Sequence, residues 1–296
     1  MKYAFIEANR RRWPISLACE VLGVSASGYH QRKRREPIDP SRPRRALSND
    51  ALLVHIRAVH ERARGEYGWP RIWKQLLVSG IRVGKERVRT LMKQHGIYAR
   101  TKRKFRVTTD SKHNLPVSPN LIGRDFSPVA PDRLWASDIT YLWTDEGWLY
   151  LAVVVDLFSR QVVGWSMKPR MKTDLVLDAL RMAWFRRRPA RGLIFHSDRG
   201  SQYCAMAFRD ALAQYGIASS MSRKGDCWDN AVVESLWGSL KLARVYGRVF
   251  ATRRAAMDEV IDWLGFYNRY RLHSTLGYVS PMSFEESWHD QQRKAA

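Results

Sequence analysis

Residues 134–167 read LWASDITYLWTDEGWLYLAVVVDLFSRQVVGWSM. The turn signal TDEG at residues 144–147 and the short FSR segment at residues 158–160 divide this stretch into three runs that are rich in aromatic and β-branched residues. Such runs are typical of β-strands. We therefore predict an antiparallel meander of three strands, at residues 134–143, 148–156 and 161–167.

The residues after the meander alternate between helix and strand patterns. Residues 172–188 have the apolar spacing of an amphipathic helix, and residues 192–198 form a short run typical of a buried strand. The series continues with a helix at 205–215, a strand at 217–221, a loop at 222–229 and a helix that begins near Ala231. Three strands followed by alternating helices and strands predict an α/β domain with a mixed five-stranded sheet and flanking helices.

The charge of the chain is uneven. Its 296 residues include 51 Lys+Arg and 28 Asp+Glu, a formal net charge of +23. Residues 1–125 hold 28 of the basic and 10 of the acidic residues, an excess of +18, which leaves +5 for the rest of the chain. An excess of this size predicts a nucleic-acid partner. We expect no membrane segment, because the longest apolar run, residues 149–155, is far shorter than the roughly 20 residues that cross a bilayer.

Two helical units are predicted in the basic region. In the first, Pro14 starts a helix and Ser25 caps a second one. In the second, Ser48 caps a helix and Pro70 opens another. A third helix of this unit carries outward-facing basic residues, Lys85, Arg89 and Lys93. Short helical units occur in many proteins, but their position in a strongly basic region favours DNA binding.

Three carboxylates stand at unusual places in the α/β region. Asp138 lies within an apolar strand, Asp198 ends another strand, and Glu234 falls in the first turn of a helix. Each alone could be a salt-bridged acid, since a carboxylate among apolar neighbours is costly unless it is paired or binds a cation. Together they are the ligands that Mg²⁺ prefers, and a pair of such ions promotes in-line displacement at phosphorus. A basic protein with these residues is predicted to be a metal-dependent phosphodiester enzyme.

Three motifs carry a family resemblance. WASDITY at 135–141, HSDRGSQY at 196–203 and DNAVVES at 229–235 resemble the three motifs of the DDE transposase and retroviral integrase superfamily. More narrowly, the chain resembles the OrfB product of bacterial insertion sequences. This similarity includes DLFSR at 156–160, NRYRLHSTLGY at 268–278 and EYGWPRI at 66–72.

The resemblance implies an RNase H-like fold and a transposase activity. Asp138, Asp198 and Glu234 would be the catalytic residues and would hold two Mg²⁺ or Mn²⁺ ions. Water would cut the element's end, and the resulting 3′-hydroxyl would attack another phosphodiester without a covalent enzyme–DNA intermediate. Lys241, seven residues after Glu234 and expected on the same helix face, would contact DNA phosphate. Arg199 and Gln202 would contact DNA or lie around the metal.

The resemblance also implies partners and a domain organisation. The substrate would be double-stranded DNA, both the ends of the insertion sequence and its target, bound in a synaptic homo-oligomer. The partner would be the upstream OrfA product or an OrfA–OrfB fusion, because this chain lacks the leucine zipper that OrfA supplies. The expected location is the bacterial cytoplasm, on the nucleoid when bound. We predict a helix-turn-helix-like basic segment at 1–40, a helical DNA-binding domain at 45–100, a basic, proline-containing linker at 101–130, and a catalytic domain with a helical C-terminal extension at 131–290.

Several alternatives stay open at this level. The protein could be a non-catalytic, sequence-specific DNA-binding regulator or an RNase H-type nuclease. His196 could orient Asp198 or simply pack within its strand, and Asp226 and Asp229 could be loop or capping residues or additional ligands. The aromatic residues near the C-terminus could form a core, which we favour, or a base-stacking surface: Trp263, Phe266, Tyr267 and Tyr270.

Overall fold

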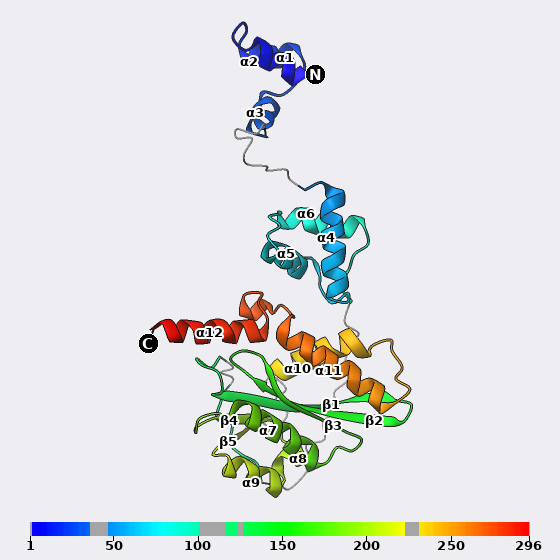
Figure 1. Cartoon of the computed structure of the whole chain (residues 1–296), viewed down its shortest axis with the longest axis vertical. Coiled ribbons are helices and arrows are strands. Elements are labelled where there is room, and N and C mark those ends of the chain that lie inside the picture. Colours follow the sequence, from blue (N-terminus) through cyan, green and yellow to red (C-terminus); the bar gives the residue numbers. More distant parts are fainter. Residues whose placement is uncertain (1, 36–46, 101–115, 124–126, 223–230, 296) are drawn as a thin grey trace. The chain divides into compact units, whose positions relative to one another are not determined.

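The computed structural model describes residues 2–35, 47–100, 116–123, 127–222 and 231–295 (Figure 1). The chain divides into two compact units, residues 1–52 and 53–296. The first contains α1 (Lys2–Asn9), α2 (Ile15–Val21) and α3 (Ala26–Arg35). Ile6, Cys19 and Tyr29 form its buried core. The sequence pattern indicated α2 and α3 but not α1, because α1 buries a single side chain and therefore shows little periodicity.

The predicted caps are present at the helix starts. The Ser25 hydroxyl accepts a hydrogen bond from the Gly28 amide at 3.0 Å, and the Ser48 hydroxyl accepts one from the Ala51 amide at 3.1 Å. Each bond satisfies an amide that the first turn of the helix would otherwise leave unpaired. Pro14 directly precedes α2, one position earlier than predicted.

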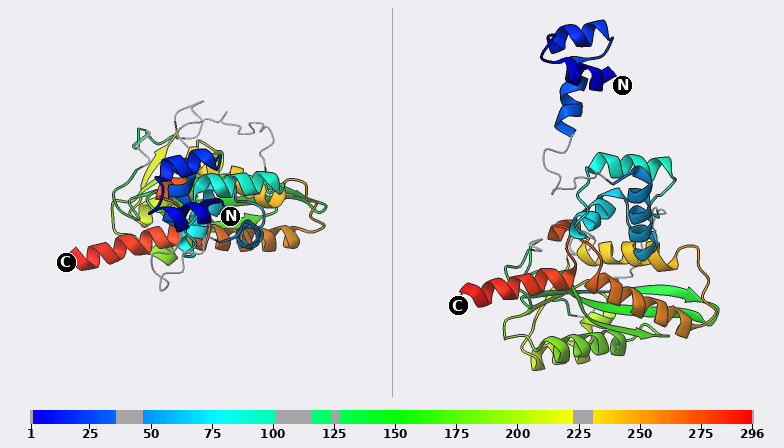
Figure 2. Two further views of the ribbon diagram at one scale, coloured as in Figure 1. Left: turned by 90° about the horizontal axis from the view of Figure 1, so that it is seen from above. Right: turned by 45° about the horizontal axis from the view of Figure 1, so that its top comes forward.

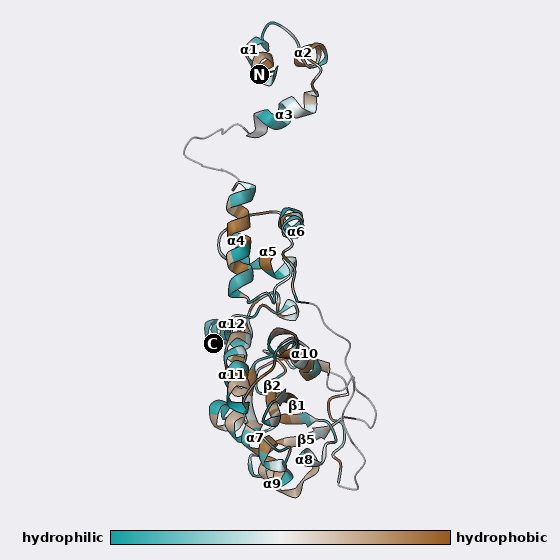
Figure 3. Ribbon diagram, turned by 90° about the vertical axis from the view of Figure 1, so that its right-hand side faces the viewer, coloured by the Kyte–Doolittle hydropathy of each residue, from teal (hydrophilic) through white to brown (hydrophobic). Residues whose placement is uncertain are grey.

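A three-helix arrangement follows Ser48, as predicted. Its elements are α4 (Asn49–Arg62), α5 (Trp69–Val78, with Pro70 in the first turn) and α6 (Lys85–Gln94). Hydrophobic and hydrophilic residues alternate along α4 (Figure 3), which is the pattern of a helix with one buried face. The fully or nearly fully buried side chains include Ile56, Ile72, Leu76, Val88, Leu91 and Met92. Lys85, Arg89 and Lys93 of α6 are exposed, as predicted.

The α/β region contains the mixed five-stranded sheet that the sequence predicted. Its strands are β1 (Leu134–Thr144), β2 (Gly147–Asp156), β3 (Val162–Lys168), β4 (Ile194–Ser197) and β5 (Ala218–Met221), in the order β3-β2-β1-β4-β5. β1, β2 and β3 pair antiparallel, which confirms the meander. β4 and β5 are added in parallel on the other side of β1.

Helices cover both faces of the sheet (Figures 1 and 2). One face carries α7 (Thr173–Arg187), α8 (Ser201–Cys204) and α9 (Met206–Gln214); the other carries α10 (Ala231–Leu240) and α11 (Arg253–Arg269). Side chains alternate between the faces of a strand, so Val153 and Val155 of β2 join the core beneath α10 and α11, whereas Ala152 and Val154 join the core beneath α7. No helix among the described residues is long and apolar enough to span a bilayer.

The C-terminal elements are η2 (Lys241–Val245), η3 (Ser274–Leu276) and α12 (Pro281–Ala295). Trp263 and Tyr267 of α11 are buried, and Phe266 packs against the same core, so the core interpretation of this aromatic stretch is confirmed for these three. It is wrong for Tyr270, whose side chain is exposed just beyond α11. Residues 101–115 of the predicted linker lie outside the described residues. Its later part contacts β5, where the Leu121 amide donates to the Ser220 hydroxyl at 2.9 Å.

Gly164 allows the close approach of β3 and α7. A Cβ atom at this position would lie 2.3 Å from the Ala179 carbonyl oxygen and 2.8 Å from the Ala183 amide nitrogen. Gly164→Ala is therefore expected to lower the free energy of unfolding by about 1–3 kcal/mol, because backbone atoms must shift. Gly265→Ala is the matched control, since Gly265 lies within α11 with no atom in the way and should gain up to about 1 kcal/mol. Urea denaturation of both variants measures the difference, and equal stabilities would refute this account of Gly164.

Candidate active site

Asp138 is the fifth residue of β1 and is largely buried. Its Oδ2 atom accepts a hydrogen bond from the indole Nε1 of Trp237 at 2.9 Å, and its Oδ1 atom accepts one from the Ile139 amide at 2.8 Å. Trp237 belongs to α10, so this bond joins the middle of the sheet to the helix that covers it. The carboxylate is thereby held in one orientation at the edge of the core.

The strand register brings Asp198 beside Asp138. Ala136 of β1 pairs in parallel with His196 of β4, and each aspartate follows two residues later. Neighbouring strands lie about 4.8 Å apart, so the two aspartates continue adjacent strands at the same level. The Oδ1 atom of Asp198 accepts a hydrogen bond from the Gly200 amide at 2.9 Å, within the turn that leads into α8. The register therefore places two of the three predicted carboxylates side by side.

Glu234 lies in the first turn of α10 and is exposed. It precedes Trp237 by three residues, and residues three apart share a helix face. The helix face that carries Glu234 is thus the one that reaches Asp138. Asp226 and Asp229, the possible additional ligands, lie outside the described residues.

The electrostatics link the three acids. The pKa of Asp138 is raised to about 7, first by burial and then by the negative charge of Asp198, with a smaller contribution from Glu234; the Trp237 hydrogen bond opposes this increase. Partial desolvation of its carboxyl group also raises the pKa of Glu234, although the residue as a whole is exposed. Among the residues that the structure describes, no three His, Cys, Asp or Glu side chains lie close enough to hold a metal ion together.

Lys241 lies near Asp138. Its ammonium lies 5.2 Å from the centre of the Tyr141 ring. Burial lowers the pKa of Lys241, and the negative charge of Asp138 partly offsets this. Lys241 starts the π-helical turn η2 directly after α10, so the seven-residue spacing from Glu234 crosses a change of helix type and does not follow one continuous α-helical face.

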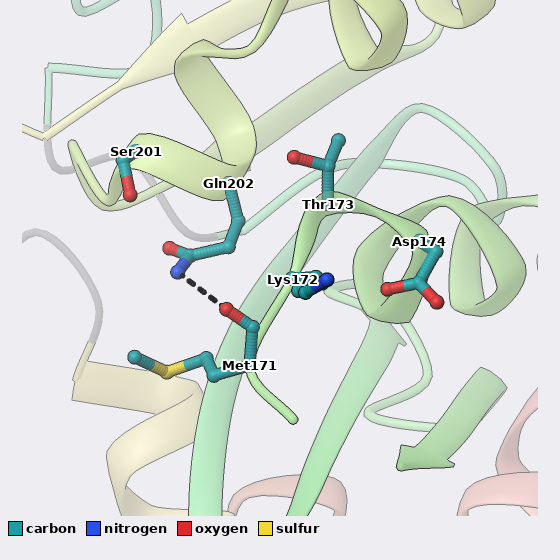
Figure 4. A pocket seen from close by; sticks show the side chains of 6 residues that line it. All are labelled: Met171, Lys172, Thr173, Asp174, Ser201 and Gln202. Carbon is teal, nitrogen blue, oxygen red and sulfur yellow. Dashed lines mark hydrogen bonds between the residues drawn. The ribbon is translucent and has the colours of Figure 1, made fainter. Parts of the chain in front are cut away.

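Arg199 and Gln202 make local hydrogen bonds. The Nε atom of Arg199 donates to the Ser222 carbonyl at 2.6 Å, and the Nε2 atom of Gln202 donates to the Met171 carbonyl at 3.1 Å. Gln202 lines a shallow depression between the start of α7 and α8 (Figure 4), whose walls are Met171, Lys172, Thr173, Asp174, Ser201 and Gln202. These contacts hold the loops that flank Asp198.

His196 is fully buried. Its Nδ1 atom lies 2.9 Å from the Ser220 hydroxyl oxygen, and its Nε2 atom lies 3.2 Å from that of Ser222. Both ring nitrogens therefore face serines on β5 or just after it. The structure supports the packed-strand interpretation of His196, because these contacts join β4 to β5.

Sequence reasoning missed two residues next to the acids. Trp237 binds the Asp138 carboxylate, and the only signal for it was its spacing from Glu234. Tyr203 is buried, with its hydroxyl 2.8 Å from that of Ser137. Burial, followed by the charges of Asp138 and Asp198, raises the pKa of Tyr203 well above its usual value, so this phenol stays neutral beside the acids.

Asp156, from the DLFSR motif, has a structural role. Its buried carboxylate accepts hydrogen bonds from the amides of Asp132, Phe158 and Ser159 at 2.7, 3.0 and 2.8 Å. These bonds shape the turn between β2 and β3 and tie it to the residues that precede β1. The motif therefore supports the sheet and contributes no side chain to the acid cluster.

Comparisons with protein families agree with this architecture. Residues 128–227 and 215–281 match two families, each described as an integrase core domain, and residues 48–105 match an HTH-like domain. The match at 128–227 covers the sheet with α7, α8 and α9, the match at 215–281 covers α10 and α11, and the HTH-like match covers α4–α6.

Similar proteins and structures come from insertion sequences and retroviruses. A 31 kDa protein of insertion element IS600 from Shigella sonnei is 45% identical over 92% of this chain and 98% of its own length. Transposase InsF for insertion sequence IS3A from Escherichia coli K12 is 41% identical over 96% and 98%. The HTLV-2 integrase catalytic core domain in complex with magnesium aligns with a TM-score of 0.40 and 17% identity, over 53% of this chain and 98% of that one.

The evidence for the family is the agreement of three observations: sheet order, acid placement and extended sequence identity. The order β3-β2-β1-β4-β5 sets Asp138 on β1 beside Asp198, which directly follows the adjacent strand β4, and the relatives match nearly the full length of the chain. The chain therefore belongs to the insertion-sequence transposases that join an HTH-like domain to an integrase core domain.

Proposed function

We propose that this chain is the catalytic subunit that cleaves the DNA ends of an insertion sequence and joins the 3′-hydroxyl to another phosphodiester by in-line transesterification. The observation that supports this most directly is the adjacent placement of Asp138 and Asp198, with the charge of Glu234 acting on the same site. In-line displacement at phosphorus needs positioning and charge neutralisation more than a protein nucleophile. A cluster of acids in a basic protein suits this chemistry.

The three carboxylates are the oxygen donors that a divalent metal prefers, and Asp138 and Asp198 end up side by side, although the three described side chains do not converge on one point. Their mutual repulsion contributes to the raised pKa of Asp138, and bound cations would relieve it. In this proposal Asp138, Asp198 and Glu234 hold two Mg²⁺ or Mn²⁺ ions, which supply Lewis-acid charge at the reacting phosphate. Trp237 fixes the orientation of Asp138, and the Gly200 amide fixes that of Asp198.

Basic side chains would bind the DNA. Lys241 is close enough to Asp138 to feel its charge, so it would contact a phosphate next to the reacting one. Arg199 and Gln202 flank Asp198 and would contact the same strand. Further from this site, the exposed Lys85, Arg89 and Lys93 of α6 would contact the duplex. The active form would be a synaptic homo-oligomer on the nucleoid, formed with the OrfA product or as an OrfA–OrfB fusion.

The proposed domains follow the sequence-based boundaries. Residues 1–40 and 45–100 would bind DNA. Residues 101–130 would connect them to the catalytic domain, which is formed by residues 131–290. The helical units alone would also suit a non-catalytic regulator, and the sheet alone would suit a nuclease of the RNase H type.

A strand-transfer assay tests the proposal. Two preparations are compared, the chain alone and the chain fused to the upstream OrfA product. Each is incubated in Mg²⁺ with a labelled element end and a target duplex. We expect cleavage and joining, loss of both in EDTA, and loss of joining alone when a pre-cleaved end carries a 3′-deoxy terminus. A regulator would bind the end and cut nothing, whereas a nuclease of the RNase H type would cut an RNA–DNA hybrid and join nothing. Either result would refute the proposal.

A further inference from the structure

Four aromatic rings gather on the β1–β2 hairpin, where Tyr150 packs against the edge of the core beneath α7 and the two tryptophans are exposed. Trp143 pairs with Trp148 across the two strands, and Tyr141 pairs with Tyr150. The ring centres of Trp143 and Trp148 lie 4.8 Å apart, and those of Tyr141 and Trp148 lie 4.9 Å apart. We call these four residues the hairpin aromatic patch.

The two tryptophans of the patch are exposed although their rings are large and apolar, and the two tyrosines are half-buried. Trp143 is 54% exposed and Trp148 42%, whereas Trp135 and Trp263 are fully buried in the same domain. Isolated exposed apolar side chains are ordinary, but a contiguous group of rings on a strand pair marks an interaction surface. The patch is therefore a candidate binding site that the proposed catalytic residues do not use.

The backbone beneath the patch is anchored. The Thr144 hydroxyl donates to the Gly147 carbonyl at 2.7 Å across the turn, and the Asp145 amide donates to the Phe250 carbonyl at 2.9 Å. The Arg253 side chain donates to the Trp148 carbonyl at 3.1 Å. A hairpin held by side chains and by the chain near α11 presents its rings in a preformed arrangement, which reduces the entropy lost when a ligand binds.

Lys241 links the patch to Asp138. Asp138 and Tyr141 lie three residues apart on β1, on opposite faces of the strand, but the Lys241 ammonium lies 5.2 Å from the centre of the Tyr141 ring and is close enough to Asp138 to feel its charge. The groups from the site outward are thus a carboxylate, a cation and then four rings that meet edge to face. A cation beside exposed aromatic rings complements a nucleotide, because the cation pairs with a phosphate and a ring face can stack on a base.

We propose that the hairpin aromatic patch binds unpaired bases of the DNA end next to the phosphodiester that reacts. This inference rests on the proposed function. A base in a duplex is stacked between its neighbours, so it can stack on Trp143 or Trp148 only after it has left the helix. Stacking of this kind strengthens binding by about tenfold or more per base, which would help to hold the strand end open beside Asp138 and Lys241.

The test uses the full chain and an element end that carries 2-aminopurine in place of a terminal base. Binding is read from 2-aminopurine fluorescence, which does not depend on cleavage. The wild type and Trp148→Phe are expected to give the same fluorescence change, and Trp148→Ala and Trp143→Ala are expected to lose most of it. On a fully paired end the alanine variants should bind about tenfold more weakly, and mismatches that unpair the terminal bases beforehand should recover most of that loss. Phe185→Ala is the control, since Phe185 is a 65% exposed ring on α7, at least as accessible as either tryptophan.

The outcomes separate this inference from the proposed function. If the alanine variants match the wild type in fluorescence and affinity, the patch does not bind bases, whether or not the chain cleaves DNA. If they weaken binding to paired and mismatched ends equally, or change only the oligomeric state in sedimentation, the patch is a protein interface and the inference is wrong. If the wild type shows the fluorescence change but never cleaves, the patch is supported as a base-binding site and the proposed catalytic function fails.

Discussion

Asp198→Asn is expected to reduce both end cleavage and strand joining in Mg²⁺ by at least about 1,000-fold, a loss of about 4 kcal/mol of transition-state stabilisation. The amide keeps the shape and the hydrogen bond from the Gly200 amide but removes one of the charges that would hold the cations. Asp138→Asn and Glu234→Gln should have similar effects. Binding of the element end, measured by fluorescence anisotropy, should stay within about threefold because the basic residues are unchanged.

Protein stability provides an internal control for this prediction. The folded state raises the pKa of Asp138 from 3.8 to about 7, so it binds this proton more tightly than the unfolded state does. The stability that results is fully present below pH 3.8 and is lost as pH rises to about 7. At pH 8 without divalent cations, Asp138→Asn should therefore melt at a higher temperature than the wild type.

Two results would contradict the assignment. Asp138→Asn that retains activity would exclude a catalytic role for this carboxylate. An equal loss of activity in Asp210→Asn, an exposed acid on α9, would show that the assay responds to any lost charge. Mg²⁺ should also raise the melting temperature of the wild type more than that of Asp138→Asn, which provides a readout independent of turnover.

Glu66→Ala is expected to lower the free energy of unfolding by about 3–5 kcal/mol. The buried Glu66 carboxylate lies 2.6 Å from the Arg271 guanidinium and 3.6 Å from that of Arg244, which is itself only 1% exposed. Removing the acid takes a shared partner from two buried cations. Among the described residues, Arg244 keeps Glu259 at 3.1 Å and Asp262 at 3.8 Å, whereas Arg271 keeps a hydrogen bond to the Ser239 hydroxyl.

A surface pair supplies the control. Arg254 and Asp258 are exposed residues one turn apart on α11, 3.0 Å from each other. Arg254→Ala should cost no more than about 1 kcal/mol, because water screens an exposed ion pair. Guanidinium chloride denaturation followed by tryptophan fluorescence compares the two variants. Equal midpoint shifts would show that the Glu66 cluster contributes no more than a surface salt bridge.

The segment that contains Glu66 also contacts a motif that lies far away in the sequence. The Tyr67 hydroxyl donates to the Tyr270 carbonyl at 3.1 Å and accepts from the Leu272 amide at 2.9 Å. Arg71 donates to the Leu272 carbonyl at 2.9 Å. The EYGWPRI motif thus contacts the NRYRLHSTLGY motif some 200 residues later. Periodicity within either segment contains no information on this pairing, because neither motif forms the contact alone.

The local elements could be predicted from sequence because their causes are local. The meander at 134–167, the caps at Ser25 and Ser48, and the helix at 173–187 follow from side-chain periodicity and hydrogen bonding over a few residues. The helix α1 was not predicted, since one buried residue makes no pattern. The three acids stood out because each occupies a place where an unpaired carboxylate is costly, although sequence alone could not show which of them meet.

Amino-acid sequence by itself determined the class of the sheet, the family motifs and the basic character of the N-terminal region. Tertiary structure alone decided that His196 faces β5 and that Trp237 holds Asp138. It also decided that Tyr270 is exposed and that Trp143 and Trp148 of the β1–β2 hairpin are exposed. The physical reason is that a strand's period assigns each side chain to a face, whereas the neighbouring strand or helix determines what that face contacts.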